Sequence, residues 1–172
     1  MLAHPDLPNQ AVSSLTVDAL RDGSLLTLTY RLSGRVDSLV LPPPAGGVRC
    51  DELWRTTCFE AFVRPGDGDA YLELNLSPST AWAAYRFSGY RAGMADARTA
   101  PPAIAFEATP DGCILTATID LPAGARALWR VALTAVIEEV SGAKSYWSLA
   151  HAPGRPDFHN AAGFTLELRE HP

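Results

Sequence analysis

Hydrophobic and polar side chains alternate along most of the chain. The alternation is clearest in residues 26–32, where Leu26, Leu28 and Tyr30 are separated by polar residues. Similar segments occur at residues 12–19, 36–41, 58–63, 70–76, 81–90, 103–109, 113–120, 128–140, 145–150 and 163–169. A period of two is the pattern of a strand that buries one face, so these segments are predicted to be β-strands.

Residues 128–140 are the one segment in which a helix competes with a strand. Val131, Leu133 and Ile137 occupy alternate positions, and β-branched residues favour the extended conformation. We therefore expect a long central strand. Turn formers such as Asp22-Gly23 and Asp111-Gly112 separate the segments. About ten short strands with turns at regular spacing predict an all-β protein, an antiparallel β-sandwich of the immunoglobulin-like or jelly-roll type.

Length and charge narrow the class of protein. The chain has 172 residues, and we treat residues 1–172 as a single domain. A formal net charge of −5 opposes binding to a phosphate backbone, so no nucleic-acid partner is predicted. No run of about 18 apolar residues occurs, so no membrane span is predicted. Residues 1–10 lack the basic and apolar parts of an export signal, and we expect a cytoplasmic protein.

The hairpin predicted for residues 58–76 has the most informative pattern. Each of its strands has an apolar face, and packing both faces on the core places Glu60 opposite Glu73 or Asn75 on the other side. That side also carries two aromatic residues, Phe62 and Tyr71. Two opposed carboxylates repel, which favours a ligand or cation between them. An ordinary solvated strand face carries the same residue types, so the hairpin alone leaves both interpretations open.

The tryptophans are candidates for stacking on a ligand ring. Trp129 begins an alternating apolar row, which predicts a core position. Trp54, Trp82 and Trp147 lie next to polar loops, where aromatic rings often contact ligands. A buried tryptophan that covers the core is the alternative at each of these positions.

Residues 147–160 contain the densest cluster of polar side chains, namely His151, Arg155, Asp157, His159 and Asn160. They provide hydrogen-bond donors and acceptors for a hydroxyl-rich ligand, although Asp and Asn also stabilise turns. His151, Asp157 and His159 are in addition the residue types of a site with two histidines and one carboxylate, which holds non-haem iron.

Several motifs carry a family resemblance. They are LWRTTCFEAF (residues 53–62), YLELNLSP (71–78), WAAY (82–85), GYRAGM (89–94), YWSLAH (146–151) and PDFH (156–159). In these motifs the chain resembles the bacterial DOMON-like proteins, which are related to family 9 carbohydrate-binding modules. The resemblance covers most of the chain from about residue 50 onward.

The resemblance implies a β-sandwich that binds a ligand on a concave sheet face and does not transform it. Carbohydrate-binding members bind sugars, so we predict a carbohydrate or sugar derivative, no cofactor, and no signal for any oligomeric state. Since an export signal is not found, an intracellular sugar, nucleotide sugar or cell-wall precursor is expected. The predicted ligand-binding residues are Trp54, Glu60, Glu73, Asn75, Trp82, Tyr85, Arg91, Trp147, His151, Asp157 and His159.

These residues are assigned separate roles. The acidic residues and Asn75 would bond ring hydroxyls, Trp82 and Trp147 would stack on the ring, and Arg91 with the histidines would hold an anionic substituent.

Other functions stay open. Cytochrome members of the family bind b-type haem through a methionine and a histidine, which implies Met94 with His151 or His159. A second alternative is non-haem iron. A third is an enzyme that uses Glu60, Glu73 and a histidine, which predicts strongly perturbed pKa values in a closed pocket. A fourth is a module that only binds other proteins, which an exposed apolar patch would favour.

Overall fold

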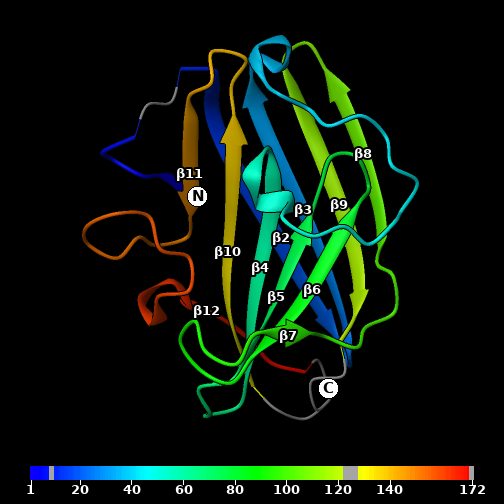
Figure 1. The fold of residues 1–172 in the computed structure, drawn as a ribbon, viewed down its shortest axis with the longest axis vertical. Helices are drawn as coiled ribbons and strands as arrows, with labels where there is room; N and C mark the ends of the chain where they lie inside the picture. Colours follow the sequence, from blue (N-terminus) through cyan, green and yellow to red (C-terminus); the bar gives the residue numbers. More distant parts are fainter. Residues whose placement is uncertain (8–9, 122–127, 171–172) are drawn as a thin grey trace.

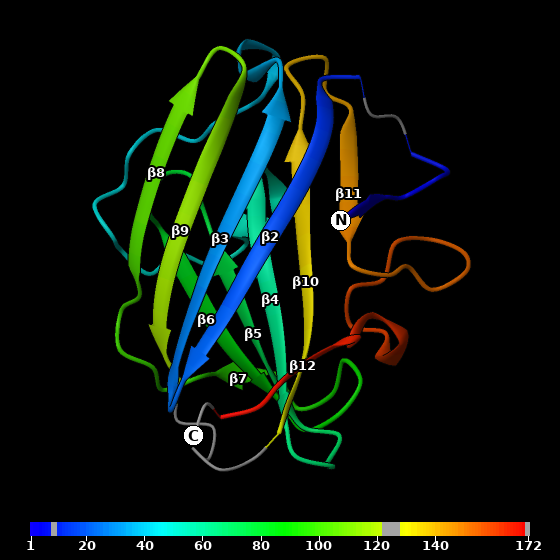
Figure 2. The ribbon, with the colours of Figure 1, turned by 180° about the vertical axis from the view of Figure 1, so that it is seen from behind.

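The computed structural model describes residues 1–7, 10–121 and 128–170. Two antiparallel sheets lie one behind the other (Figures 1 and 2). The larger sheet consists, in spatial order, of β1 (Leu2–Ala3), β11 (Lys144–Ser148), β10 (Trp129–Glu138), β4 (Cys58–Pro65), β5 (Tyr71–Leu76), β6 (Trp82–Phe87) and β7 (Ala95–Asp96), and β12 (Leu166–Leu168) pairs with β10. The smaller sheet consists of β2 (Val12–Asp22), β3 (Leu25–Gly34), β9 (Gly112–Asp120) and β8 (Ala103–Thr109). The predicted β-sandwich is confirmed.

The main hydrophobic core fills the space between the two sheets. The larger sheet contributes the alternating residues of β4 and β10, and the smaller sheet contributes residues such as Leu28 and Leu115. Trp129 is fully buried in this core, as predicted. The long central strand predicted for residues 128–140 is also confirmed, as β10 pairs with both β4 and β11.

The strand predicted for residues 36–41 is wrong. The segment begins with a short 3₁₀ helix, η1 (Val36–Ser38), in which the Leu39 N–H donates to the Val36 carbonyl. Leu39 forms only an isolated bridge with Glu139, which follows β10. The chain crosses here from the smaller sheet to the larger one, and its backbone contacts are divided between the turn and single hydrogen bonds such as that from the Val40 N–H to the Glu138 carbonyl. Burial of Val36 and Leu39 produces the apolar alternation without a strand.

The larger sheet is buried on its outer face as well. A second hydrophobic cluster lies there, formed by Leu53, Cys58, Phe62, Tyr71, Ala81, Ala83, Tyr85, Phe87, Ala132 and Phe164. Short 3₁₀ helices η2 (Leu53–Arg55) and η3 (Ala161–Gly163) and their adjoining loops contribute to it. The candidate site lies on this covered outer face. Within the described residues, no helix is long and apolar enough to cross a membrane.

Candidate functional site

A cavity of about 410 Å³ opens on the outer face of the larger sheet. Strands β4, β5, β10 and β11 provide its floor, and its walls come from η2, the loop after β6 and the loop between β11 and β12. Its lining residues are Trp54, Glu60, Phe62, Glu73, Phe87, Arg91, Met94, Val136, Tyr146, Pro156, Phe158 and His159. The volume lies in the range of small-molecule sites, about 300–1,000 Å³.

Two carboxyl groups reach the cavity from neighbouring strands. Glu60 on β4 is paired with Asn75 on β5, and Glu73 is paired with Phe62, so both acidic side chains point to the outer face. Glu60 is 3% exposed and Glu73 is 6% exposed. The Thr134 hydroxyl donates to Glu60 Oε2 at 3.1 Å, and the Asn75 amide donates to Glu73 Oε1 at 2.7 Å. Each carboxyl group is therefore held by one neutral donor.

Burial changes the protonation of these groups. Loss of water around Glu60, with a smaller contribution from the charge of Glu73, raises the pKa of Glu60 to about 8. Burial also raises the pKa of Glu73 above its usual value, although the hydrogen bond from Asn75 opposes this. Glu60 is thus largely protonated at neutral pH, and it carries a hydroxyl donor as well as acceptor oxygens.

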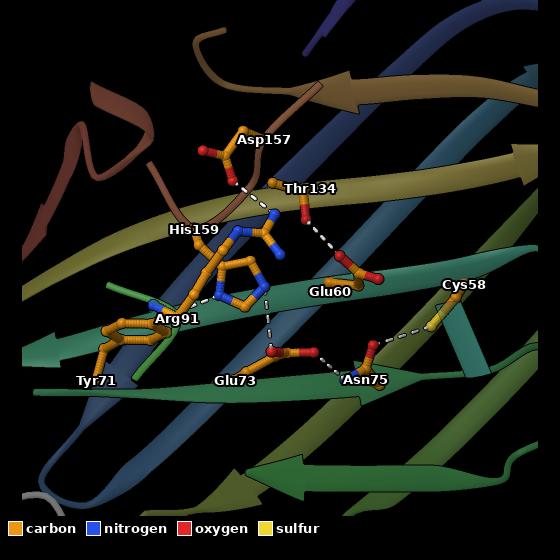
Figure 3. A network of polar contacts seen from close by, with 9 residues as sticks. All are labelled: Cys58, Glu60, Tyr71, Glu73, Asn75, Arg91, Thr134, Asp157 and His159. Carbon is orange, nitrogen blue, oxygen red and sulfur yellow. Dashed lines mark hydrogen bonds and ion pairs between the residues drawn. The ribbon is translucent and has the colours of Figure 1, made fainter. Parts of the chain in front are cut away.

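His159 connects the loop between β11 and β12 to the sheet. Its Nδ1 lies 2.7 Å from the Tyr71 hydroxyl, and its Nε2 lies 3.7 Å from Glu73 Oε2 (Figure 3). Burial, with the charge of Arg91, lowers the pKa of His159 to about 4, so the imidazole is neutral at pH 7. The contact with Glu73 is therefore not an ion pair at that pH. A neutral ring whose Nδ1 accepts from Tyr71 presents its Nε2–H on the side of Glu73.

Arg91 and Asp157 join the loop after β6 to the loop between β11 and β12. Arg91 Nη2 donates to Asp157 Oδ1 at 2.8 Å, and the Tyr90 hydroxyl donates to Asp157 Oδ2 at 2.7 Å. The Arg91 N–H also donates to the Tyr71 hydroxyl at 3.2 Å, and Arg91 has a φ of 50°. A side chain in this left-handed region costs free energy, so the contacts on both sides of Arg91 hold the loop in place.

Aromatic rings pack against the polar side chains of the cavity. Tyr71 and Phe87 stack with their ring centroids 4.8 Å apart and an angle of 8° between the planes. The His159 ring packs edge-on against Phe62 and Phe87, at 5.1 Å from each. Such packing fixes the position of the imidazole relative to the two carboxyl groups.

The structure brings most of the predicted site residues together. Trp54, Glu60, Glu73, Arg91 and His159 line the cavity. Asn75 and Asp157 contact lining residues by hydrogen bonds to Glu73 and Arg91. Tyr85 is paired with Glu73 in the sheet, but its hydroxyl donates to Asp51 at 2.6 Å.

Three predicted residues lie elsewhere, which corrects the expected stacking and anion-binding roles. Trp82 and Trp147 are 7% and 4% exposed and belong to the core between the sheets. Trp82 is paired with Leu76 and Trp147 with Ala135, which are residues of the inner face of the larger sheet. The two tryptophan rings therefore point away from the cavity. His151 Nε2 lies 2.9 Å from the Leu2 carbonyl, and its ring packs edge-on against His4.

Several lining residues were not predicted as ligand contacts. Val136 and Tyr146 lie on the outer face of β10 and β11, and Phe87 ends β6. Side chains alternate between the two faces of a strand, so these three residues could have been assigned to the outer face once the core-facing positions were known. Pro156 and Phe158 come from a loop without periodicity, and the PDFH motif that contains them carries the family resemblance without marking either residue as a ligand contact.

The structure places the two histidines of the non-haem iron alternative apart, whereas one of the two residue pairs expected for haem lines the cavity. Among residues 1–7, 10–121 and 128–170, no group of three or more His, Cys, Asp or Glu side chains is arranged to hold a metal ion. His151 and His159 have separate partners at the N-terminal segment and at the cavity. Met94 and His159 both line the cavity, and haem binding stays a prediction.

Comparisons with known proteins agree with the fold. No protein-family model matches the chain, and no curated protein matches it significantly. A protein from Bacteroides uniformis ATCC 8492, described as a "putative carbohydrate-binding protein", is similar with a TM-score of 0.71 and 15% identity over 95% of this chain and 81% of that chain. A family 9 carbohydrate-binding module from Caldicellulosiruptor kristjanssonii, solved with glucose, has a TM-score of 0.50 and 13% identity over 86% of this chain and 74% of that chain. At these identities the likeness is one of fold.

Proposed function

We propose that the protein binds a small carbohydrate or sugar derivative in the cavity on the outer face of the larger sheet, without transforming it. The observation that carries the proposal is the composition of the cavity wall. Two buried carboxyl groups and a neutral imidazole lie beside aromatic rings in one space of about 410 Å³. Sugar hydroxyls need donors and acceptors together, and the C–H faces of a sugar ring pack on aromatic faces.

The polar groups have complementary hydrogen-bonding capacities. Glu60, protonated at neutral pH, both donates and accepts. Glu73 accepts, and Arg91 donates. Trp54 is 47% exposed while lining the cavity, so its ring is accessible to a ligand. The fold that the chain shares with structures described as carbohydrate-binding supports this choice among polar ligands.

A thermal-shift screen of neutral, amino and acidic monosaccharides and short oligosaccharides tests the proposal. At a ligand concentration of 100 times Kd, binding adds about 2.7 kcal/mol to the free energy of unfolding. For a domain of this size, that corresponds to a rise in Tm of roughly 5–10 °C. Calorimetric titration should then give a Kd that Glu73→Gln weakens at least tenfold.

The matched control is Glu107→Gln, the same substitution at an exposed position of β8 in the smaller sheet. It should leave the Kd unchanged. Equal affinities of the wild type, Glu73→Gln and Glu107→Gln would place the ligand outside the cavity. Absence of binding to any sugar would contradict the proposed function.

One observation supports a second candidate, an enzyme that uses acid–base chemistry. The pKa of Glu60 is raised to about 8 in a cavity that also holds a second carboxyl group and a histidine of lowered pKa. Such perturbed pairs occur at catalytic sites and also in structural networks. Incubation of the protein with aryl glycosides and oligosaccharides distinguishes the two candidates. Product formation that Glu60→Gln abolishes would establish the enzyme, whereas intact ligand would support binding alone.

A further inference from the structure

We propose that the ligand carries a protonated amino group, which the carboxyl groups of Glu60 and Glu73 hold inside the cavity. This inference rests on the proposed function and specifies its ligand as an amino sugar. It follows from the partners of the two carboxyl groups, from the charges around them and from the aromatic lining of the cavity.

As far as the described residues go, each of the two carboxyl groups has one oxygen that is hydrogen-bonded to the protein and one that is not. Thr134 donates to Glu60 Oε2, and Asn75 donates to Glu73 Oε1. In the described part of the chain, Glu60 Oε1 has no hydrogen-bond partner, although Glu60 is only 3% exposed and lines the cavity. His159 Nε2 lies 3.7 Å from Glu73 Oε2, beyond hydrogen-bond distance. Figure 3 shows Glu73 next to His159, and Glu60 on the neighbouring strand with its contact to Thr134. The free oxygens are therefore available to a ligand.

Within residues 1–7, 10–121 and 128–170, no lysine or arginine neutralises these carboxyl groups by direct contact. Among the described residues, neither Glu60 nor Glu73 forms an ion pair with a lysine or an arginine. Arg91 lines the same cavity, but Asp157 binds its guanidinium, and Arg91 acts on Glu73 only through its charge at longer range. A buried carboxylate without a counter-ion costs free energy, so Glu60 keeps its proton, and a cationic ligand group would lower the cost of ionising it.

Apart from Arg91, the described titratable groups that face the two carboxyls carry no positive charge at neutral pH. Glu60 is faced by the Cys58 thiol and by the Tyr30 hydroxyl, which donates to the Glu60 carbonyl at 2.7 Å. Burial raises the pKa of both of these groups, so both are neutral. Glu73 is faced by Tyr71, Tyr85 and His159 in addition to Arg91. A ligand ammonium would thus be the positive charge in contact with the pair.

The aromatic lining also suits a cation. Phe62, Phe87 and Tyr146 line the cavity together with the carboxyl groups. An ammonium group is attracted to the face of an aromatic ring, and more strongly where water is excluded. An anionic ligand group would instead face two acidic residues and an arginine that Asp157 already binds. These contacts favour an amino group over the anionic substituent expected from the sequence.

The test compares sugars that share one ring and differ in one substituent. Glucose, glucosamine, N-acetylglucosamine and glucuronic acid, and the corresponding galactose series, would be titrated calorimetrically at pH 6 and pH 7. We expect glucosamine or galactosamine to bind at least tenfold more tightly than its neutral parent. Because the bound ammonium favours ionised Glu60, binding should release close to one proton, and affinity should rise up to tenfold per pH unit. The neutral sugars should release none.

Variants make the test specific to the carboxyl pair. Glu60→Gln should abolish proton release and reduce the preference for the amino sugar to within about threefold, while neutral sugars still bind. Glu73→Gln serves as the second variant, and Glu107→Gln should behave as the wild type. If neutral or acidic sugars bind as tightly as the amino sugars, this inference is overturned and the proposed function stands. If no sugar binds, both fail.

Discussion

Replacing Glu60 by glutamine should change how stability depends on pH. The ordinary pKa of a glutamate is 4.5, and burial raises that of Glu60 to about 8. The folded protein therefore holds this proton more tightly than the unfolded chain does. The stability contributed by Glu60 is complete below pH 4.5 and is lost as the pH rises to about 8. Within this window, each rise of one pH unit lowers the free energy of unfolding by about 1.4 kcal/mol for one bound proton.

The size of the effect follows from these two pKa values. Between pH 5.5 and pH 7.5, the wild type should lose about 2.5 kcal/mol of unfolding free energy relative to Glu60→Gln. His159 acts in the opposite direction, because burial lowers its pKa from 6.5 to about 4. Its contribution is present above pH 6.5 and is lost as the pH falls to about 4. The comparison with the variant cancels this contribution, because both proteins contain His159.

Urea unfolding at half-unit steps from pH 5 to pH 8, followed by tryptophan fluorescence, measures the difference. Glu107→Gln is the matched control, since this residue is exposed on β8. Its plot of unfolding free energy against pH should run parallel to that of the wild type. If the curve of Glu60→Gln is also parallel, to within about 0.5 kcal/mol, Glu60 is not a buried, protonated carboxyl group and the reasoning fails.

Three further substitutions test the arrangement of the site. Tyr71→Phe removes the hydroxyl between His159 and the Arg91 N–H, so urea unfolding should show a loss of about 1–3 kcal/mol, and an unchanged stability would contradict these hydrogen bonds. Trp147→Phe should cost about 1–3 kcal/mol of stability without changing sugar affinity, because Trp147 lies in the core. Trp54→Ala should do the reverse, with a severalfold weaker Kd and a stability change below about 0.5 kcal/mol. A titration in which Trp147→Phe weakens binding more than Trp54→Ala would reverse these two assignments.

The sequence determined which face of each strand is buried, and with it the position of the two carboxyl groups. Adjacent side chains of a strand point to opposite sides of the sheet. If the apolar faces of β4 and β5 both pack on the core, it is therefore fixed which residues of each strand point outward. Glu60 and Glu73 therefore had to share the outer face, and the structure pairs Glu60 with Asn75. The same logic placed Trp129 in the core.

Only the tertiary structure decided how that outer face is covered. A strand with alternating residues is expected to expose one side, yet β4 is buried on both, because loops distant in the sequence pack over it. Loop residues follow no period, so their directions depend on tertiary contacts. His151 and His159 lie eight positions apart by number, yet one contacts the N-terminal segment and the other faces the cavity. Trp82 and Trp147 likewise turned inward, because each belongs to a strand whose register fixes its side.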